Sequence, residues 1–336
     1  MLLKLMMIAL AILSRGSASN HCNFPSIYNF GDSNSDTGGG SAAFAAVPPP
    51  NGVTFFGKPS GRRCDGRLII DFIAEEVKLP YLSAYLDSVG ARSFKHGANF
   101  GIGGASIRPG GYSPFNLGIQ ISQFQQFKAR TVDLYNHHNN KATLPNPEDF
   151  SSALYALDIG QNDLSYGFQH TSEDQVRASI PDILHHLITA IQRHIRVETG
   201  QFGSEWVRED SNEVAQEFNR QLKTLLTQLE TRLPNAVIKY VDVYSAKYAL
   251  ISDAKNQGFV DPMKFCCGSY YGCHVDCGKR VVVNGTLYGD ACSDPWAHIS
   301  WDGVHYSEAA NRWVARHIIN GSILDPQRSL EPTIFP

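Results

Sequence analysis

Three short apolar runs, each ending in a polar or glycine-rich turn, constrain the fold of this chain more than any other feature. The runs lie at 27–31, 95–100 and 153–159. The residues that follow each run cannot prolong a strand, because glycine and small polar side chains favour turns. Segments with the periodicity of amphipathic helices separate the runs. This alternation predicts an α/β fold with a parallel sheet that helices cover on both faces.

Helix-forming segments occupy much of the remaining chain, and one more apolar strand is expected at 235–243. Pro181 interrupts one helical segment, which predicts a break or a division into two helices. No repeat, low-complexity tract or linker divides the chain, so we expect a single domain over 21–336. The expected helices span 65–79, 119–135, 171–197, 211–233, 244–255 and 307–319.

The first twenty residues have the composition of a secretory signal. Lys4 supplies a positive start, an apolar run follows at 5–13, and small residues at 17–19 suit cleavage. We therefore predict a signal peptide over 1–20 and export of the remaining chain. No later segment reaches the roughly 20 apolar residues of a membrane-spanning helix. Sequons beginning at Asn284 and Asn320 predict glycosylation, which fits export.

Charge and cysteine content narrow the partners and bound groups. A formal net charge of −3 gives no basic footprint, so neither nucleic acid nor an anionic membrane is an expected partner. Five of the seven cysteines fall within 266–292, together with His274. Zinc is conceivable from these ligand types, but disulfides are the expected state in an exported chain, and we predict no metal. The odd number leaves one thiol without a partner in the chain.

Two polar turns, far apart in the sequence, contain the parts of a nucleophilic catalyst. Ser33 follows the first apolar run, and chemistry collects at the carboxyl ends of strands in open α/β sheets. A hydroxyl nucleophile needs a base, and the base needs an orienting carboxylate. Asp302 and His305 stand three residues apart around a tight turn, which suits those two roles. The simpler alternatives are a helix cap for Ser33 and ordinary surface positions for Asp302 and His305.

An oxyanion needs preorganised hydrogen-bond donors, and two further turns can supply them. The expected donors are the backbone N–H groups of Ser33 and Gly104 and the side-chain amide of Asn162. Asn162 or Asp163 could instead cap the following helix, and Gly104 could serve only a turn. The four turns together nevertheless provide every part that acyl transfer requires.

These turns resemble the conserved blocks of plant GDSL-type esterases/lipases, which belong to the SGNH hydrolase superfamily. The sequence FGDSNSDTG at 30–38 is similar to the first block, with Ser33 at the nucleophile. ANFGIGGA at 98–105 resembles the second block and places its oxyanion glycine on Gly104. GQND at 160–163 resembles the third, with Asn162 as donor, and DGVH at 302–305 resembles the last.

The resemblance implies a three-layer α/β/α, flavodoxin-like fold and serine-dependent ester hydrolysis without metal or cofactor. It implies a secreted carboxylesterase, acetylesterase or lipase-like enzyme, located outside the cell or in the cell wall. The substrates would be small-molecule, lipid or glycan esters. Acyl and alcohol specificity does not follow from the resemblance.

One departure from the family concerns the stretch between the two longest helices. Family members carry an apolar strand there, whereas 198–210 is too polar for a buried strand. A sheet short of one strand around 198–210 is therefore expected. The alternative function is a catalytically impaired or silent relative that binds a glycan or a protein in the same cleft. A weaker alternative is a glycosidase using Asp32 and Asp163, since that chemistry needs two carboxylates.

Overall fold

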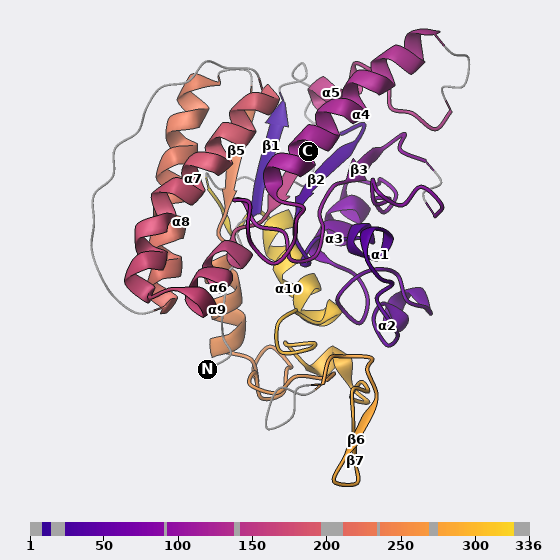
Figure 1. Ribbon diagram of the computed structural model, residues 1–336, viewed down its shortest axis with the longest axis vertical. Helices are drawn as coiled ribbons and strands as arrows, with labels where there is room; N and C mark the ends of the chain where they lie inside the picture. The colour runs from indigo at the N-terminus through magenta and orange to yellow at the C-terminus, as the bar shows by residue number, and fades with distance from the viewer. Residues whose placement is uncertain are drawn as a thin grey trace, which may run out of the picture.

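The computed structural model describes residues 9–14, 24–90, 93–137, 142–195, 211–233, 236–268 and 275–325. Its centre is a six-stranded sheet with the order β3-β2-β4-β1-β5-β8 (Figure 1). Strand β2 pairs in parallel with β3 and β4, whereas β1 is antiparallel to β4 and β5. The expected α/β class is confirmed, with antiparallel strands added to a parallel sheet. The strands are β1 (Ala9–Ser14), β2 (Ile27–Gly31), β3 (Gly97–Asn99), β4 (Leu154–Asp158), β5 (Ala236–Val241) and β8 (Leu324–Asp325).

Helices cover both faces of the sheet because successive side chains of a strand point to opposite faces. Tyr28 and Phe30 of β2 share a buried cluster with α4, α7 and α8, whereas Ile27 and Leu154 pack on the opposite face with α3. Val241 joins α10 on that second face. The helices are α1 (Gly39–Ala43), α2 (Val53–Phe56), α3 (Ile69–Glu76), α4 (Leu117–His137), α5 (Asp149–Ser152), α6 (Gln161–His170), α7 (Glu173–Ile195), α8 (Ser211–Arg232), α9 (Val243–Ser252) and α10 (Glu308–Ile319).

Helix α7 continues through Pro181, so the predicted break there is wrong. A proline inside a helix removes one backbone hydrogen bond and costs about 3 kcal/mol. Ile180, Ile183 and Leu184 are fully buried on either side of it. Each large apolar side chain contributes roughly 1.5–3 kcal/mol on burial, so packing outweighs the local preference. Helices α7 and α8 lie side by side (Figure 1).

Strand β1 comes from within the predicted signal peptide. Residues 9–14 pair along their whole length with β5 and along 9–13 with β4, so they form an inner strand of the sheet. Neither the rest of the predicted signal, 1–8 and 15–20, nor the stretch 198–210 is among the described residues. This N-terminal strand therefore separates β4 from β5 in the described sheet.

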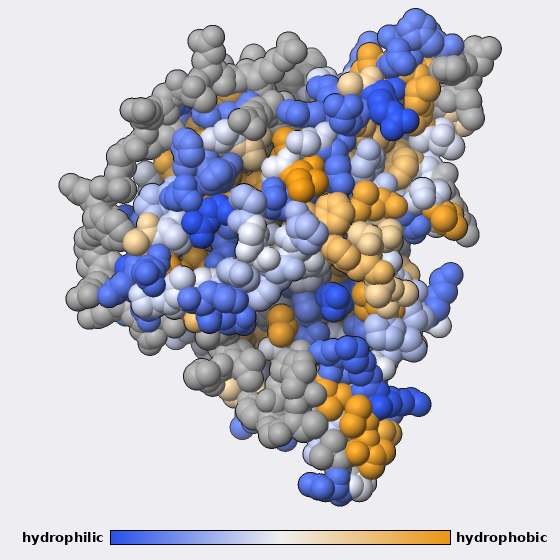
Figure 2. Space-filling view, viewed as in Figure 1, coloured by the Kyte–Doolittle hydropathy of each residue, from blue (hydrophilic) through white to orange (hydrophobic). Residues whose placement is uncertain are grey.

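The cysteine-rich region forms a protruding hairpin and two disulfides. Strands β6 (Val281–Val283) and β7 (Thr286–Tyr288) join through Asn284 and Gly285, both with positive φ as a tight hairpin turn requires. Figure 2 shows apolar side chains on this hairpin, where Val282 and Leu287 are exposed.

Disulfides join Cys266 to Cys292 and Cys267 to Cys277, which confirms the disulfide interpretation for these four. Cys64 is free and buried, while Cys22, Cys273 and His274 lie outside the described residues. Across the described ranges, no helix is long and apolar enough to cross a membrane.

Candidate active site

The turn after β2 is built around a glycine that no other residue could replace. A Cβ at Gly31 would stand 2.4 Å from both the Asp158 carbonyl oxygen and the Ser35 hydroxyl. Gln120 of α4 holds the same residue on both sides, accepting from the Gly31 N–H at 2.9 Å and donating to its carbonyl at 2.8 Å. Ser33, two residues later, is therefore placed by a fixed strand end.

Two buried asparagines on neighbouring strands hold the loop that contains Ser33. The Asn29 amide donates to the Asn99 side-chain oxygen at 2.8 Å and to the Ser35 hydroxyl at 3.0 Å. Asn99 in turn donates to the Ser35 carbonyl at 2.6 Å and to the Thr37 hydroxyl at 2.9 Å. Its oxygen also accepts the Gly101 N–H at 2.8 Å. Buried polar groups that are fully paired rigidify a loop.

A buried carboxylate joins this loop to the second glycine-rich turn. Asp36 accepts the backbone N–H groups of Gly38, Gly39 and Gly40 and, from the second turn, that of Gly103. Burial raises the pKa of Asp36, and the four N–H donors oppose that rise. A Cβ at Gly103 would lie 3.8 Å from the Ser33 Cβ, so the two turns are neighbours.

Two backbone donors at this junction have no acceptor in the part of the chain that the structure describes. Within the described residues, neither the Ser33 N–H nor the Gly104 N–H donates to any acceptor. Gly104 has φ of +78°, and a Cβ there would come within 3.3 Å of the Tyr112 Cβ. The Asn162 amide donates to the Ala105 carbonyl at 2.9 Å, which places Asn162 beside Gly104. The three predicted oxyanion donors thus come from turns that adjoin one another.

The two carboxylates considered for glycoside hydrolysis, Asp32 and Asp163, both form hydrogen bonds with neighbouring loop residues. Asp163 accepts the backbone N–H groups of Ile107 at 2.7 Å and Arg108 at 3.0 Å, one on each oxygen. Burial raises the pKa of Asp163 to about 6 despite these hydrogen bonds. Asp32 accepts from Asn34 through one oxygen, and its other oxygen has no partner among the described residues. Asp163 therefore anchors the loop that follows Gly104.

The turn before α10 joins an aspartate to a histidine. Asp302 accepts the backbone N–H groups of Val304 and His305 through one oxygen. Its other oxygen lies 2.7 Å from the Nδ1 atom of His305. Burial opposes ionisation of Asp302, but the charge of His305 and these hydrogen bonds outweigh it and lower the pKa of Asp302. An ionised Asp302 favours the His305 tautomer with its proton on Nδ1. The other ring nitrogen, Nε2, is then left without a proton and points away from Asp302, where it can accept one.

Elements from distant parts of the chain hold this turn. The Trp301 indole donates to Asn51 at 2.9 Å, and the Trp301 carbonyl accepts the N–H groups of Cys266 and Cys267. Helix α10 is tied to the segment just before α3, because the Glu308 N–H donates to Asp65 and the Glu308 carboxylate pairs with Arg67 at 2.7 Å. The disulfide-bonded cysteines thus support the turn that contains Asp302 and His305.

The chain matches the model of the GDSL-like Lipase/Acylhydrolase family over residues 27–318, which include all four turns. The chain belongs to this family.

Curated relatives extend over nearly the whole chain. A GDSL esterase/lipase of Arabidopsis thaliana is 50% identical over 335 residues, covering 92% of this chain and 90% of the relative. GDSL esterase/lipase ACHE of Zea mays is 44% identical over 360 residues, covering 94% of this chain and 90% of the relative. Alpha-L-fucosidase 3 of Arabidopsis thaliana is 40% identical over 358 residues, covering 94% and 96%.

Membership of the GDSL-like family makes the chain a carboxylic ester hydrolase, as the sequence predicted. The alternative of a silent binding protein is not favoured, because the family match extends across every predicted site turn.

A buried lysine that the sequence did not single out lies between the two halves of this GDSL-like site. The Lys247 ammonium of α9 stands 3.7 Å from the ring centroid of Tyr306, which follows His305. Its charge also acts on Asp32, which precedes Ser33, and on Asp158 at the end of β4. Burial lowers the pKa of Lys247 and raises that of Asp158. In the sequence, Lys247 lies within the helix expected at 244–255, and nothing in the local pattern marks it.

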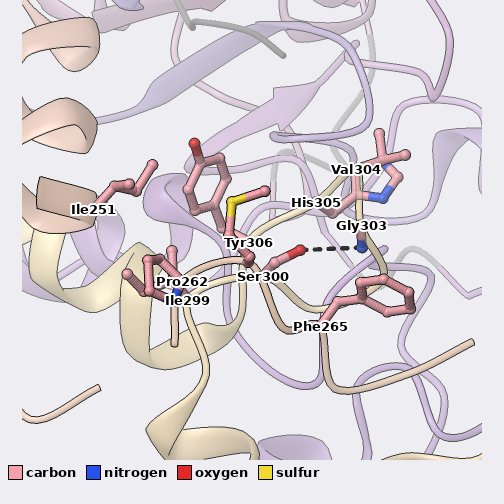
Figure 3. A pocket seen from close by; sticks show the side chains of 10 residues that line it. Ile251, Pro262, Phe265, Ile299, Ser300, Gly303, Val304, His305 and Tyr306 are labelled. Atoms are coloured by element: carbon pink, nitrogen blue, oxygen red, sulfur yellow. Dashed lines mark hydrogen bonds between the residues drawn. The ribbon is translucent and has the colours of Figure 1, made fainter. Parts of the chain in front are cut away.

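A hollow that opens to solvent lies beside His305. Figure 3 shows Pro262, Phe265 and Val304 among the side chains around it. The Ser300 hydroxyl accepts the Gly303 N–H at 3.0 Å, and this hydrogen bond helps to hold the conformation of the turn that contains Asp302 and His305. Its lining combines apolar side chains with polar surface from Ser300 and His305.

Ser33 and His305 make no hydrogen bond to each other, and the Ser33 hydroxyl has no hydrogen-bond partner in the described part of the chain. Catalytic hydrogen bonds are often long in a free enzyme and tighten only in the complex. The structure therefore contains the Asp302–His305 pair already formed and the Ser33 hydroxyl without a competing partner.

Proposed function

We propose that this GDSL-like chain hydrolyses carboxylic esters through an acyl-enzyme formed on Ser33. The observation that supports this most is the 2.7 Å hydrogen bond between the buried, ionised Asp302 and Nδ1 of His305. It leaves Nε2 of His305 as the base, since a carboxylate at Nδ1 selects that tautomer. The interactions of Lys247 with both turns support their proximity.

In this mechanism the Ser33 oxygen attacks the acyl carbon while His305 takes the hydroxyl proton. The carbonyl oxygen becomes an oxyanion, which accepts from the Ser33 N–H, the Gly104 N–H and the Asn162 amide. Each such donor is worth roughly 3–4 kcal/mol of transition-state stabilisation. His305 then gives its proton to the leaving alcohol. Water, activated by His305, attacks the acyl-enzyme and releases the carboxylic acid.

The proposed substrates are small-molecule, lipid or glycan esters, and the proposed location is outside the cell or in the cell wall. The apolar side chains of Pro262, Phe265 and Val304 in the hollow beside His305 support a substrate with an apolar part. Asn284 and Asn320, the two sequon asparagines, are both exposed, which supports their glycosylation during export. The sequence at 1–20 supports a signal peptide.

The proposal is tested by hydrolysis of p-nitrophenyl acetate. We expect Ser33→Ala to lose at least ~10³-fold in kcat, because no other group can form the acyl-enzyme. Ser88→Ala, at an exposed position outside the four turns, is the matched control and should retain full turnover. Circular dichroism should show that both variants remain folded. Turnover in the Ser33 variant equal to that of the control would exclude Ser33 as the nucleophile.

Glycoside hydrolysis is a second candidate, favoured by the relative named Alpha-L-fucosidase 3. It requires two carboxyl groups that flank the scissile bond. Asp163 is engaged by two backbone N–H groups, which argues against Asp32 and Asp163 as that pair. A p-nitrophenyl fucoside assayed beside p-nitrophenyl acetate separates the two activities. We expect release of p-nitrophenol from the ester alone.

A further inference from the structure

The inner position of the sheet between β4 and β5 is filled by the N-terminal strand β1, which lies within the predicted signal peptide. Strand β1 lies between β4 and β5 and is antiparallel to both, so β4 and β5 run parallel to each other. Without β1, two parallel strands would face each other across a gap one strand wide. A parallel sheet in a domain of this type normally continues with a strand brought in by the intervening helices.

The chain between β4 and β5 offers no other strand for this position among its described residues. Helices α6, α7 and α8 follow one another there, and α7 packs against α8. The comparison with the maize relative extends over 360 positions, more than the 336 residues of this chain. The relative therefore contains residues that have no counterpart here.

We propose that the position between β4 and β5 is a binding site for a β-strand, and that Ala9–Ser14 of the uncleaved chain is its occupant. Within this register Leu10 lies opposite Leu157 and Tyr240, and Ile12 lies opposite Tyr155 and Ile238. The occupant is thus paired on both sides, as an inner strand is.

The backbone of β4 shows which groups depend on this occupant. The Leu154 N–H donates to the Ser26 carbonyl, on the side of β2. Because successive N–H groups of a strand point to opposite sides, those of Tyr155 and Leu157 point toward β1. Both residues are buried, so an empty position would leave their N–H groups without a partner and away from bulk water.

Removal of a signal peptide over 1–20 would empty this position. Ser33, Gly104 and Asn162 follow β2, β3 and β4, all on one side of it, and the α3–α10 contacts hold Asp302 and His305 to that side. Lys247 follows β5 on the other side. The proposal rests on the fold alone, so it stands whether or not Ser33 is a nucleophile.

Residue-resolved hydrogen exchange on the full chain tests the proposal with two variants of one residue. Ala11 lies opposite Ala156 and Lys239, in the middle of β1. Ala11→Pro removes a ladder hydrogen bond that an inner strand cannot lose, whereas Ala11→Val keeps it and favours a strand. We expect the proline variant to exchange the Tyr155 and Leu157 amides at least ~10-fold faster. The valine variant should match the unmodified chain.

The amides of Leu154 and of β2 serve as internal references, because they pair on the side away from β1. Equal exchange of Tyr155 and Leu157 in the proline and valine variants would overturn the proposal.

A second measurement uses a chain made without residues 1–20, to which a synthetic peptide of residues 7–16 is added. We expect the peptide to restore protection of Tyr155 and Leu157, and the same peptide with proline at residue 11 to restore none. Full protection in the shortened chain without any peptide would also contradict the proposal.

Discussion

The two turns that form the proposed catalytic site are supported in opposite ways. The loop with Ser33 is held from within the sheet, by Asn29 and Asn99 on adjacent strands and by the Asp36 carboxylate. The turn with Asp302 and His305 is held from outside the sheet, by the Trp301–Asn51 hydrogen bond and the disulfide-bonded cysteines. The nucleophile thus depends on the core, and the base depends on peripheral loops.

This difference means that the two halves should fail under different perturbations. A change beneath Ser33 removes several buried hydrogen bonds at once, so stability and turnover should fall together. A change in the cysteine-rich region should loosen His305 while the sheet stays intact.

The largest effect is expected for Asp302→Asn. The amide keeps an oxygen for the Val304 and His305 N–H groups, but it loses the charge that selects the His305 tautomer. We expect kcat for p-nitrophenyl acetate to fall by roughly 10³- to 10⁴-fold with little change in melting temperature. A fall of less than ~10-fold would show that the pair seen in the structure does not serve catalysis.

Asn99→Ala should produce the combined loss expected of the sheet-supported turn. It removes hydrogen bonds to Asn29, Ser35, Thr37 and Gly101 and leaves their buried groups unpaired. We expect the free energy of unfolding to fall by about 3 kcal/mol and kcat to fall by roughly 10²-fold. Asn136→Ala, at an exposed position whose side chain makes no hydrogen bond within the described residues, is the control and should change neither. Unchanged turnover in a destabilised Asn99 variant would refute the link between core and nucleophile.

Loss of the Cys267–Cys277 disulfide should have a smaller effect on turnover. The double variant Cys267→Ser with Cys277→Ser opens a loop whose cysteines are 10 residues apart and contact Trp301. We expect a loss of about 2–3 kcal/mol in stability and only a few-fold loss in kcat. Calorimetry and steady-state kinetics provide both values. A greater loss of kcat than in Asn99→Ala would reverse the comparison between the two turns.

The smallest effect concerns Lys247, which lies between the turns. Burial lowers its pKa from 10.5 to about 7, so between those values the folded chain binds fewer protons than the unfolded chain. Stability should therefore rise with pH in that window, by up to about 1.4 kcal/mol per unit. Asp158, whose pKa burial raises to about 7, has the opposite effect, but only below that pH.

Denaturant titrations from pH 7.5 to 9.5 measure the Lys247 contribution. Lys247→Met should lack the rise seen in the unmodified chain, since it has no proton to lose. Identical slopes for the two proteins would show that Lys247 is not held in a charge-disfavouring environment.

Local pattern predicted the strands and turns that lead to Ser33, Gly104 and Asn162, because each is an apolar run that stops at glycine or a polar cluster. His305 was predicted from its spacing to Asp302 in the turn before a helix. The Asn29–Asn99 pair was not predicted, since a polar residue in a strand usually marks an exposed face. One observation could have indicated it. Asn29 stands between Tyr28 and Phe30 in an apolar run, and all three side chains are buried.

Nonlocal packing explains what local pattern missed elsewhere. The role of Lys247 depends on Asp32, Asp158 and Tyr306, which are distant in sequence. Strand β1 could not be predicted, because an apolar segment of nine residues fits a signal peptide and an inner strand equally well. Pro181 was misread because the buried residues around it, which hold α7 together, contact helices far along the chain.

The most direct test of the central claim, that the turn after β2 and the turn before α10 form one catalytic site, is the rate at which a fluorophosphonate modifies the full chain. Peptide mass spectrometry should find the adduct on Ser33, and His305→Ala should slow its formation by at least ~10²-fold while the fold is retained. An adduct elsewhere, or an equal rate in the His305 variant, would contradict the account.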